Sequence, residues 1–118
     1  MSHRVLVVET DLHAAIATQR ALALAGFVDV ATVCAEEPYS AVLQAQHQAQ
    51  FSTGVIITGG LNNACGGLVG YRNTPTIIYT GAPVRYEGRF GAVPVVSKPD
   101  AAAMVAAVRR ILGMEEGA

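Results

Sequence analysis

The stretch GVIITGGL, residues 54–61, decides how this chain folds. It is a short, β-branched apolar run that breaks into a pair of glycines. A continuous apolar run bounded by turn residues is typical of a parallel strand buried on both faces. Sites in open α/β sheets form where loops leave the carboxyl ends of such strands. Thr58 ends this run, and the functional prediction depends on its being a neutral hydroxyl and not a carboxylate.

The composition bounds the class of protein. The 118 residues suffice for one domain, which we take to span residues 1–118. Apolar residues make up 52% of the chain and charged residues 14%, with a formal net charge of -1. This is the composition of a folded globular domain and not of a disordered one. No clustered basic charge is present, so we expect no nucleic-acid partner.

Cysteine usage and hydropathy favour a cytoplasmic protein. Cys34 and Cys65 show no close spacing; one disulfide is possible, but two reduced thiols are the default in the cytosol. No CxxC or HExxH pattern occurs. A strand-like run begins almost at once, so we expect no signal peptide. Apolar segments are all interrupted well before 18 residues, so we expect no membrane span.

Strand and helix patterns alternate along the chain. We predict strands at residues 4–8, 28–34, 55–58, 76–80 and 93–97, and helices at 12–25, 36–50 and 101–112. The glycine-rich segments 59–74 and 81–92 are poor helix formers, and we allow one or two helical turns around residues 65–71. Right-handed crossovers then give a doubly wound parallel sheet, with the first and last helices on one face. Pro94 places the fifth strand at an edge.

Polar side chains should meet at the carboxyl edge of this sheet. They are Glu9, Thr10, Asp11, Thr58, Thr80 and Lys98. Thr10 or Asp11 is also expected to cap the first helix. Whether the two acids have a further role in a site stays open on residue type alone.

Four motifs carry a family resemblance: RVLVVETD (4–11), VIITGGL (55–61), TIIYTGA (76–82) and VVSKP (95–99). Over essentially the whole chain they resemble the receiver domain of bacterial two-component response regulators, the CheY-like family. The resemblance implies a flavodoxin-like fold, a single five-stranded parallel sheet in the order 2-1-3-4-5. It also implies phosphorelay signalling through protein partners. Helices after the third and fourth strands, present in the family, should here be short or missing.

The family holds Mg²⁺ with an acidic pair after the first strand, and that pair is half present here. Glu9 and Thr10 stand at the two positions, with Asp11 next. Mg²⁺ requires hard oxygen ligands, usually one or two carboxylates together with phosphate oxygens. The resemblance therefore implies weak Mg²⁺ binding at Glu9 and Asp11 at most, and no other metal or cofactor.

The family's phosphorylated aspartate is replaced. Thr58 stands at its position, Thr80 matches the hydroxyl switch and Lys98 matches the lysine. Phosphoryl transfer to aspartate uses an already ionised carboxylate, whereas a threonine hydroxyl needs an activating base. We expect a degenerate phospho-site in a pseudo-receiver that is not an enzyme. Lys98 and Glu9 should form a partly exposed pair worth about 0–1 kcal/mol and, with both hydroxyls, a fixed polar cluster.

The two glycine-rich segments should lie on the face opposite the first and last helices and cover it thinly. Exposed apolar surface generally marks an association site, so we expect a homodimer or a protein partner there. The candidate anchors and polar rim are Tyr71, Tyr86, Phe90, Arg72, Arg85 and Arg89. The alternative is that the aromatic side chains fold inward as core plugs.

Two further functions compete with the signalling one. The chain could be a small anion- or nucleotide-binding module whose backbone N–H groups cradle a ligand. The loops concerned are Thr58-Gly59-Gly60 and Thr80-Gly81, which match neither GxGxxG nor a Walker A motif. A hydrolase or transferase with Thr58 or Cys65 as nucleophile lacks a visible base.

Overall fold

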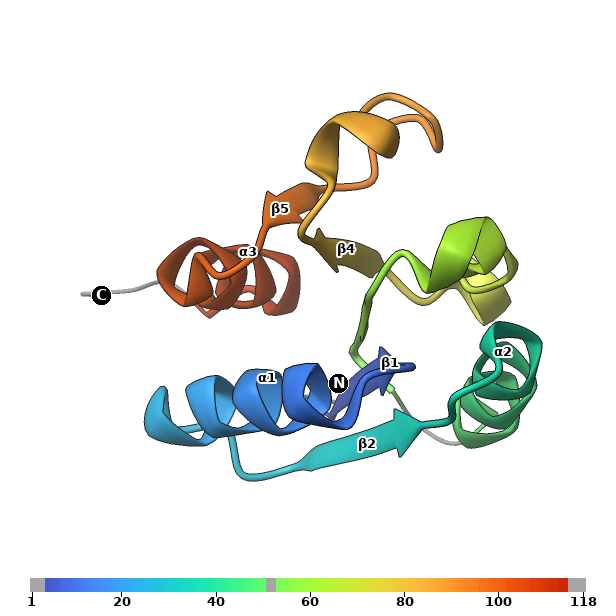
Figure 1. Cartoon of the computed structure of the whole chain (residues 1–118). Helices are drawn as coiled ribbons and strands as arrows, with labels where there is room; N and C mark the ends of the chain where they lie inside the picture. The colour runs from blue at the N-terminus through green and yellow to red at the C-terminus, as the bar shows by residue number, and fades with distance from the viewer. Residues whose placement is uncertain (1–3, 51–52, 115–118) are drawn as a thin grey trace.

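Five parallel strands form one sheet in the order β2-β1-β3-β4-β5 (Figure 1). The computed structural model describes residues 4–50 and 53–114. The strands are β1 (Val5–Glu9), β2 (Val30–Cys34), β3 (Val55–Thr58), β4 (Thr76–Thr80) and β5 (Val95–Ser97). The order and the parallel pairing confirm the predicted flavodoxin-like class, and β5 lies at an edge as Pro94 predicted.

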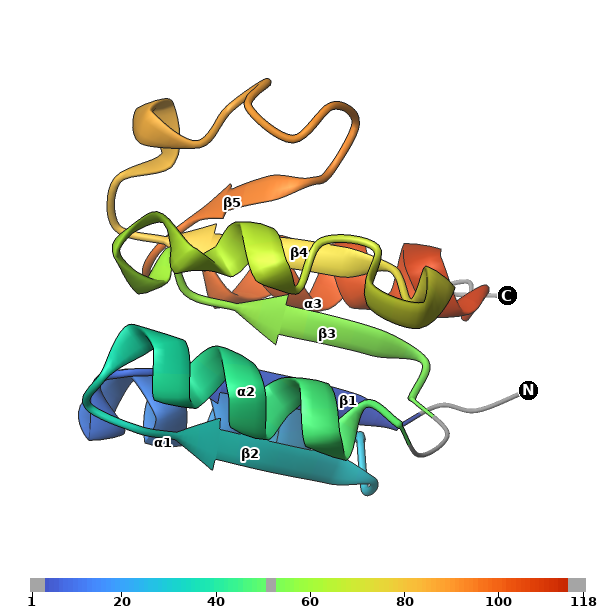
Figure 2. The same cartoon turned by 90° about the vertical axis from the view of Figure 1, so that its right-hand side faces the viewer.

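Helices cover the two faces of the sheet differently. The helices are α1 (Leu12–Leu24), α2 (Pro38–Gln48) and α3 (Ala101–Leu112). Figure 1 shows α1 and α3 together on one face, as predicted, with α2 on the other. Beside α2 lie two 3₁₀ segments, η1 (Leu61–Gly67) and η2 (Tyr71–Asn73), which face the viewer in Figure 2. A third, η3 (Pro83–Arg85), follows β4.

Side-chain caps fix where the helices begin. Asp11 accepts a hydrogen bond from the backbone N–H of His13 (2.9 Å), so it and not Thr10 caps α1. Asp100 accepts one from the N–H of Ala103 (3.0 Å) and caps α3 in the same way. Each cap satisfies a backbone donor that has no partner within the helix.

The segment after β3 departs from prediction. A short helix around residues 65–71 was expected, but η1 begins earlier and η2 forms a separate turn. The cause is a run of left-handed residues at Leu61 (φ 50°), Asn62 (φ 51°) and Asn63 (φ 74°), which breaks any α-helical path. Asparagine tolerates this conformation better than most residues. The 81–92 segment, expected to contain no helix, contains the single turn η3.

The core has a layer on each face of the sheet. Along β1, Val5 and Val7 pack toward α1 and α3, whereas Leu6 and Val8 pack toward α2 and η1. All four residues of β3 are buried, as its continuous apolar run predicted. A central strand buried on both sides places its carboxyl end, Thr58, in the middle of the sheet edge.

Candidate functional site

The carboxyl ends of four strands lie together at one edge of the sheet. Val8 pairs in register with Thr58 across β1 and β3. The N–H of Gly59 donates to the carbonyl of Val8 (3.0 Å), and the N–H of Lys98 donates to the carbonyl of Thr80 (2.8 Å). The residues that follow β1, β3, β4 and β5 therefore converge, as expected for parallel strands.

An ion pair joins two of these strand ends. Lys98 Nζ donates to Glu9 Oε2 at 2.5 Å. Only 7% of the Glu9 side chain is exposed, against 25% for Lys98. Burial raises the pKa of Glu9, and the hydrogen bond from Lys98 opposes that rise. The pair is more buried than expected, so loss of Lys98 would leave a buried charge uncompensated.

The two predicted hydroxyls are directed to the backbone. Thr58 Oγ1 donates to the carbonyl of Gly59 (2.8 Å), and Thr80 Oγ1 accepts from the N–H of Ala82 (3.1 Å). Among the described residues, neither hydroxyl has a recorded hydrogen bond to Glu9 or Lys98. The predicted four-membered cluster is therefore an ion pair flanked by two separately bonded hydroxyls.

Two glycines allow close approaches beside Thr58. A Cβ on Gly59 would lie 2.8 Å from both carboxylate oxygens of Glu9, so that carboxylate rests on the backbone after β3. A Cβ on Gly60 would lie 2.4 Å from Cζ of the Tyr86 ring. Sequence reasoning treated this glycine pair as a turn and missed both contacts. A glycine directly after a buried strand was the available signal.

The acidic residues do not provide a good Mg²⁺ site. The Glu9 carboxylate is engaged by Lys98, and the exposed Asp11 holds the N-terminus of α1 through the N–H of His13. Thr10, half-buried, contributes no carboxylate. In the part of the chain that the structure describes, no three or more His, Cys, Asp or Glu side chains gather in a metal-binding arrangement. A dication here would have to compete with an ammonium for one carboxylate, so the donor set does not fit the ion.

The aromatic association candidates divide by burial. Tyr86 is 4% exposed and packs with Cys65 and Ile78. This residue therefore folds inward as part of the core, which was the alternative to an exposed anchor for a partner. Phe90 packs against the same cluster, and Tyr71 against the α2 side of the core; both are half-buried. The face is therefore better covered than the glycine content predicted.

The arginine candidates remain on the surface. Arg72, Arg85 and Arg89 are all exposed. The Arg72 guanidinium lies 5.9 Å from the centre of the Tyr71 ring, and Arg89 donates to the side-chain oxygen of Asn63 at 3.5 Å. The three arginines that were predicted to form a polar rim are therefore exposed, but the aromatic rings that they were expected to surround are buried or half-buried.

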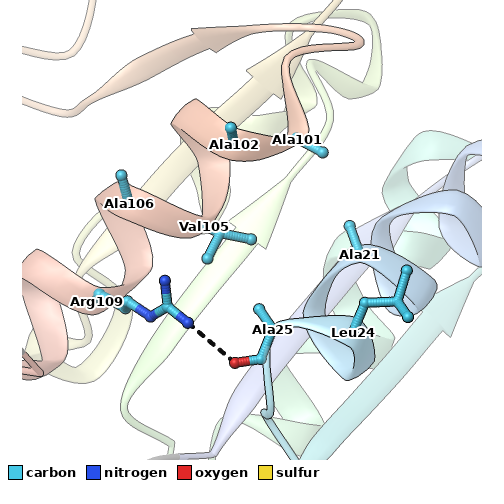
Figure 3. Close-up of a pocket in the computed structure, with 8 residues that line it drawn as sticks. All are labelled: Ala21, Leu24, Ala25, Ala101, Ala102, Val105, Ala106 and Arg109. Carbon is cyan, nitrogen blue, oxygen red and sulfur yellow. Dashed lines mark hydrogen bonds between the residues drawn. The ribbon is translucent and has the colours of Figure 1, made fainter. Parts of the chain in front are cut away.

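A separate hollow of about 440 Å³ lies between α1 and α3 (Figure 3). Its lining is mostly alanine, with Leu24 and Val105. The charged residue in the lining, Arg109, donates to the carbonyl of Ala25 at 3.0 Å, at the end of α1. The lining contains no nucleophile and no carboxylate, so the hollow carries no chemistry.

No family model matches the sequence, and the search of curated proteins found no match. Solved structures do match. A response regulator receiver protein from Burkholderia phymatum superposes with a TM-score of 0.66 at 20% identity, over 97% of this chain and 98% of that one. The response regulator domain of Thermotoga maritima CheB gives 0.66 at 20% identity, over 95% and 97%. At this identity the likeness establishes the fold, which is that of receiver domains.

Two further observations concern the cysteines and the length of the helices. Cys34, exposed, and Cys65, buried, are both free thiols, so the disulfide left open by the sequence is not formed. None of the helices within residues 4–50 and 53–114 has the length and apolar character needed to cross a bilayer.

Proposed function

We propose that this chain is a receiver-like signalling domain of the two-component class that is not switched by phosphorylation. It works through protein partners in the cytoplasm and has no catalytic activity of its own. The observation that carries the proposal is the Glu9–Lys98 ion pair beside Thr58, at the strand end where receivers carry their acceptor aspartate. The receiver fold of the solved neighbours supports the class.

The chemistry at Thr58 argues against phosphoryl transfer. Its side chain is fully buried, and its hydroxyl proton points to the carbonyl of Gly59. A hydroxyl becomes a useful nucleophile when a base removes this proton. The neighbouring carboxylate, Glu9, is already engaged by Lys98. A base in the required state is therefore lacking among the groups described around Thr58.

The same geometry argues for one fixed state. The Lys98 ammonium, which the resemblance assigns to the phospho-site, already has a carboxylate partner within the chain. Thr80, at the switch position, holds the N–H of Ala82. A new ligand shifts a two-state equilibrium only through a difference in affinity for the two states. Lys98 and Thr80 are both engaged within the chain, so a phosphoryl group at this site would gain few new contacts in a second state. Its affinity for the two states would therefore differ little.

The competing functions fit the geometry less well. An anion cradled by the loop after β3 would meet the Glu9 carboxylate over Gly59 and the Tyr86 ring over Gly60. Cys65 is fully buried, and burial raises the pKa of its thiol, which disfavours the reactive thiolate. Neither the anion-binding module nor the nucleophilic enzyme gains support.

Incubation with acetyl phosphate and Mg²⁺, followed by intact-protein mass spectrometry, tests the proposal. A receiver domain that retains the acceptor aspartate, treated in parallel, serves as the positive control. We expect the control to gain one phosphoryl group and this chain to keep its mass. A stoichiometric phosphoryl adduct on this chain, whether an acid-stable ester on Thr58 or a labile acyl phosphate on a carboxylate, would overturn the proposal.

A further inference from the structure

Residues 81–92 form a segment that we call the strap, and it lies against the connection that follows β3, residues 59–66. Four of the strap's N–H groups donate to carbonyls within the strap itself, those of Arg85, Tyr86, Glu87 and Arg89. Gly88 (φ 72°) and Gly91 (φ 69°) turn the backbone near its far end. The strap therefore makes its own turns, and side chains hold it against the connection.

Two aromatic side chains of the strap contact glycines of the connection. The Tyr86 ring lies so close to Gly60 that a Cβ there would overlap it, and only 4% of Tyr86 is exposed. A Cβ on Gly66 would lie 3.1 Å from Cε1 of the Phe90 ring. Cys65, which lies between these glycines in the sequence, packs in the same cluster as Tyr86. The strap therefore contacts the connection near both of its ends.

Between these contacts the connection adopts a backbone conformation that its residues disfavour. Leu61 (φ 50°), Asn62 (φ 51°) and Asn63 (φ 74°) are three consecutive left-handed residues. Left-handed backbone is unfavourable for residues other than glycine, and it persists where the surrounding contacts impose it. Arg89 of the strap adds a third contact here, because it donates to the side-chain oxygen of Asn63 at 3.5 Å. The strained run is thus enclosed by strap contacts.

The connection also touches the ion pair at the strand ends. A Cβ on Gly59 would lie 2.8 Å from both carboxylate oxygens of Glu9. Of two adjacent glycines, Gly59 therefore lies against the Glu9 carboxylate and Gly60 against the Tyr86 ring. Movement of the strap would reach Glu9 through this one dipeptide.

We propose that the strap and the connection form one conformational switch, which opens as a unit while the sheet stays folded. The structure is the closed state, in which strap contacts impose the left-handed run of residues 61–63. In the open state Tyr86 leaves the connection, the run relaxes, and the backbone against Glu9 is no longer held.

This switch links two distant parts of the surface. Coupling between sites requires an element with two arrangements that both sites bias. Here one site is the outer side of the strap, where Val84 is 85% exposed, and the other is the Glu9–Lys98 pair. Opening requires no phosphoryl group, so the switch does not depend on the proposed signalling function.

Native-state hydrogen exchange of the wild-type protein, followed by NMR, tests the shared opening. Two buried residues have amides that report it: Cys65 donates to the carbonyl of Gly60 (3.4 Å), and Tyr86 to that of Pro83 (3.0 Å). We expect both amides to be protected, with protection factors that agree within about threefold and lie at least about tenfold below those of β3. Unprotected amides, a larger difference between them, or a smaller gap to β3 would overturn the proposal.

Paired truncations test whether the strap holds the connection. Tyr86→Ala removes the ring over Gly60, whereas the control Tyr71→Ala removes a half-buried ring that packs on the α2 side. We expect Tyr86→Ala to lower the protection of the Cys65 amide relative to β3 by about tenfold or more, and to shift the ¹³C signal of the Glu9 carboxylate. Tyr71→Ala should do neither, and Tyr86→Phe, which keeps the ring, should resemble wild type.

Equal effects of the two alanine variants would contradict the proposal, as would a Glu9 carboxylate signal that Tyr86→Ala leaves in place. Tyr86→Leu takes the place of Tyr86→Ala if alanine unfolds the domain, and the exchange experiment on the wild-type protein needs no variant.

Discussion

The Glu9 carboxylate lies between two neighbours that fix its position. Lys98 holds one oxygen, and the bare backbone of Gly59 lets both oxygens approach to within a distance that any Cβ would block. Burial of this carboxylate costs solvation free energy, which the ammonium offsets in part. The carboxylate that the family resemblance assigns to a metal site thus binds the ammonium group of Lys98 from its own chain.

Glu9→Gln should remove a pH-dependent part of the stability. Burial raises the pKa of Glu9, so the folded state binds this proton more tightly than the unfolded state does. The free energy of unfolding of wild type relative to Glu9→Gln should therefore fall as pH rises from about 4.3, the ordinary glutamate value, through the raised pKa. Urea unfolding over a pH series measures this difference. Exposed Glu87→Gln serves as the matched control, and a difference that grows with pH would contradict the assignment.

Gly60→Ala should destabilise the domain because its Cβ would overlap the Tyr86 ring. The backbone angles of Gly60 suit alanine (φ -65°, ψ -25°), so overpacking alone should act, at about 1–3 kcal/mol. Gly81→Ala is the control, since nothing lies within 4 Å of its Cβ. Chemical unfolding measures both. Equal free energies of unfolding for the two variants would show that the Tyr86 ring does not pack against the backbone of Gly60.

Among the elements, the strands were predictable and the 3₁₀ segments were not. β3 and β4 match their predicted bounds because a continuous apolar run between turn residues has few other solutions. The start of η1 was not predictable, because leucine by itself disfavours the left-handed backbone conformation that Leu61 adopts. The surrounding fold imposes that conformation.

The candidate site was predictable to the same extent. Strand ends placed Glu9 and Lys98 together, because parallel strands share a carboxyl edge. The partners of Thr58 and Thr80 could not be foreseen, since a hydroxyl rotates to whichever backbone group is nearest. The burial of Tyr86 was equally hidden, because residues 81–92 show no period that marks an inward face.

Replacing Asp11 distinguishes a helix cap from a metal ligand. Asp11→Ala removes the acceptor for the N–H of His13 and should lower the free energy of unfolding by about 0.5–2 kcal/mol. Asp11→Asn keeps an acceptor oxygen and should retain most of the stability. Urea unfolding with and without Mg²⁺ measures both effects. If asparagine were as damaging as alanine, and Mg²⁺ stabilised only the wild-type protein, Asp11 would be a ligand and not a cap.

At the scale of the whole molecule, one face is regular and the other is not. α1 and α3 cover one side with full helices, whereas α2 and short 3₁₀ segments cover the other (Figures 1 and 2). The irregular side still buries Leu61, Leu68 and Tyr86, so its short segments act as core cover. The fold thus keeps the five-stranded parallel sheet of receiver domains, whereas the helices that the family resemblance places after β3 and β4 are reduced to short 3₁₀ segments.

The most direct test is a ¹H–¹⁵N NMR titration of the whole chain with Mg²⁺ and beryllofluoride, which mimics an acyl phosphate. The account predicts that the amide signals of Gly59, Ala82 and Lys98 stay in place, while those of a receiver with the acceptor aspartate shift under the same conditions. Saturable shifts centred on these three amides would show that the strand ends still accept a phosphoryl group and its metal, and would contradict the account.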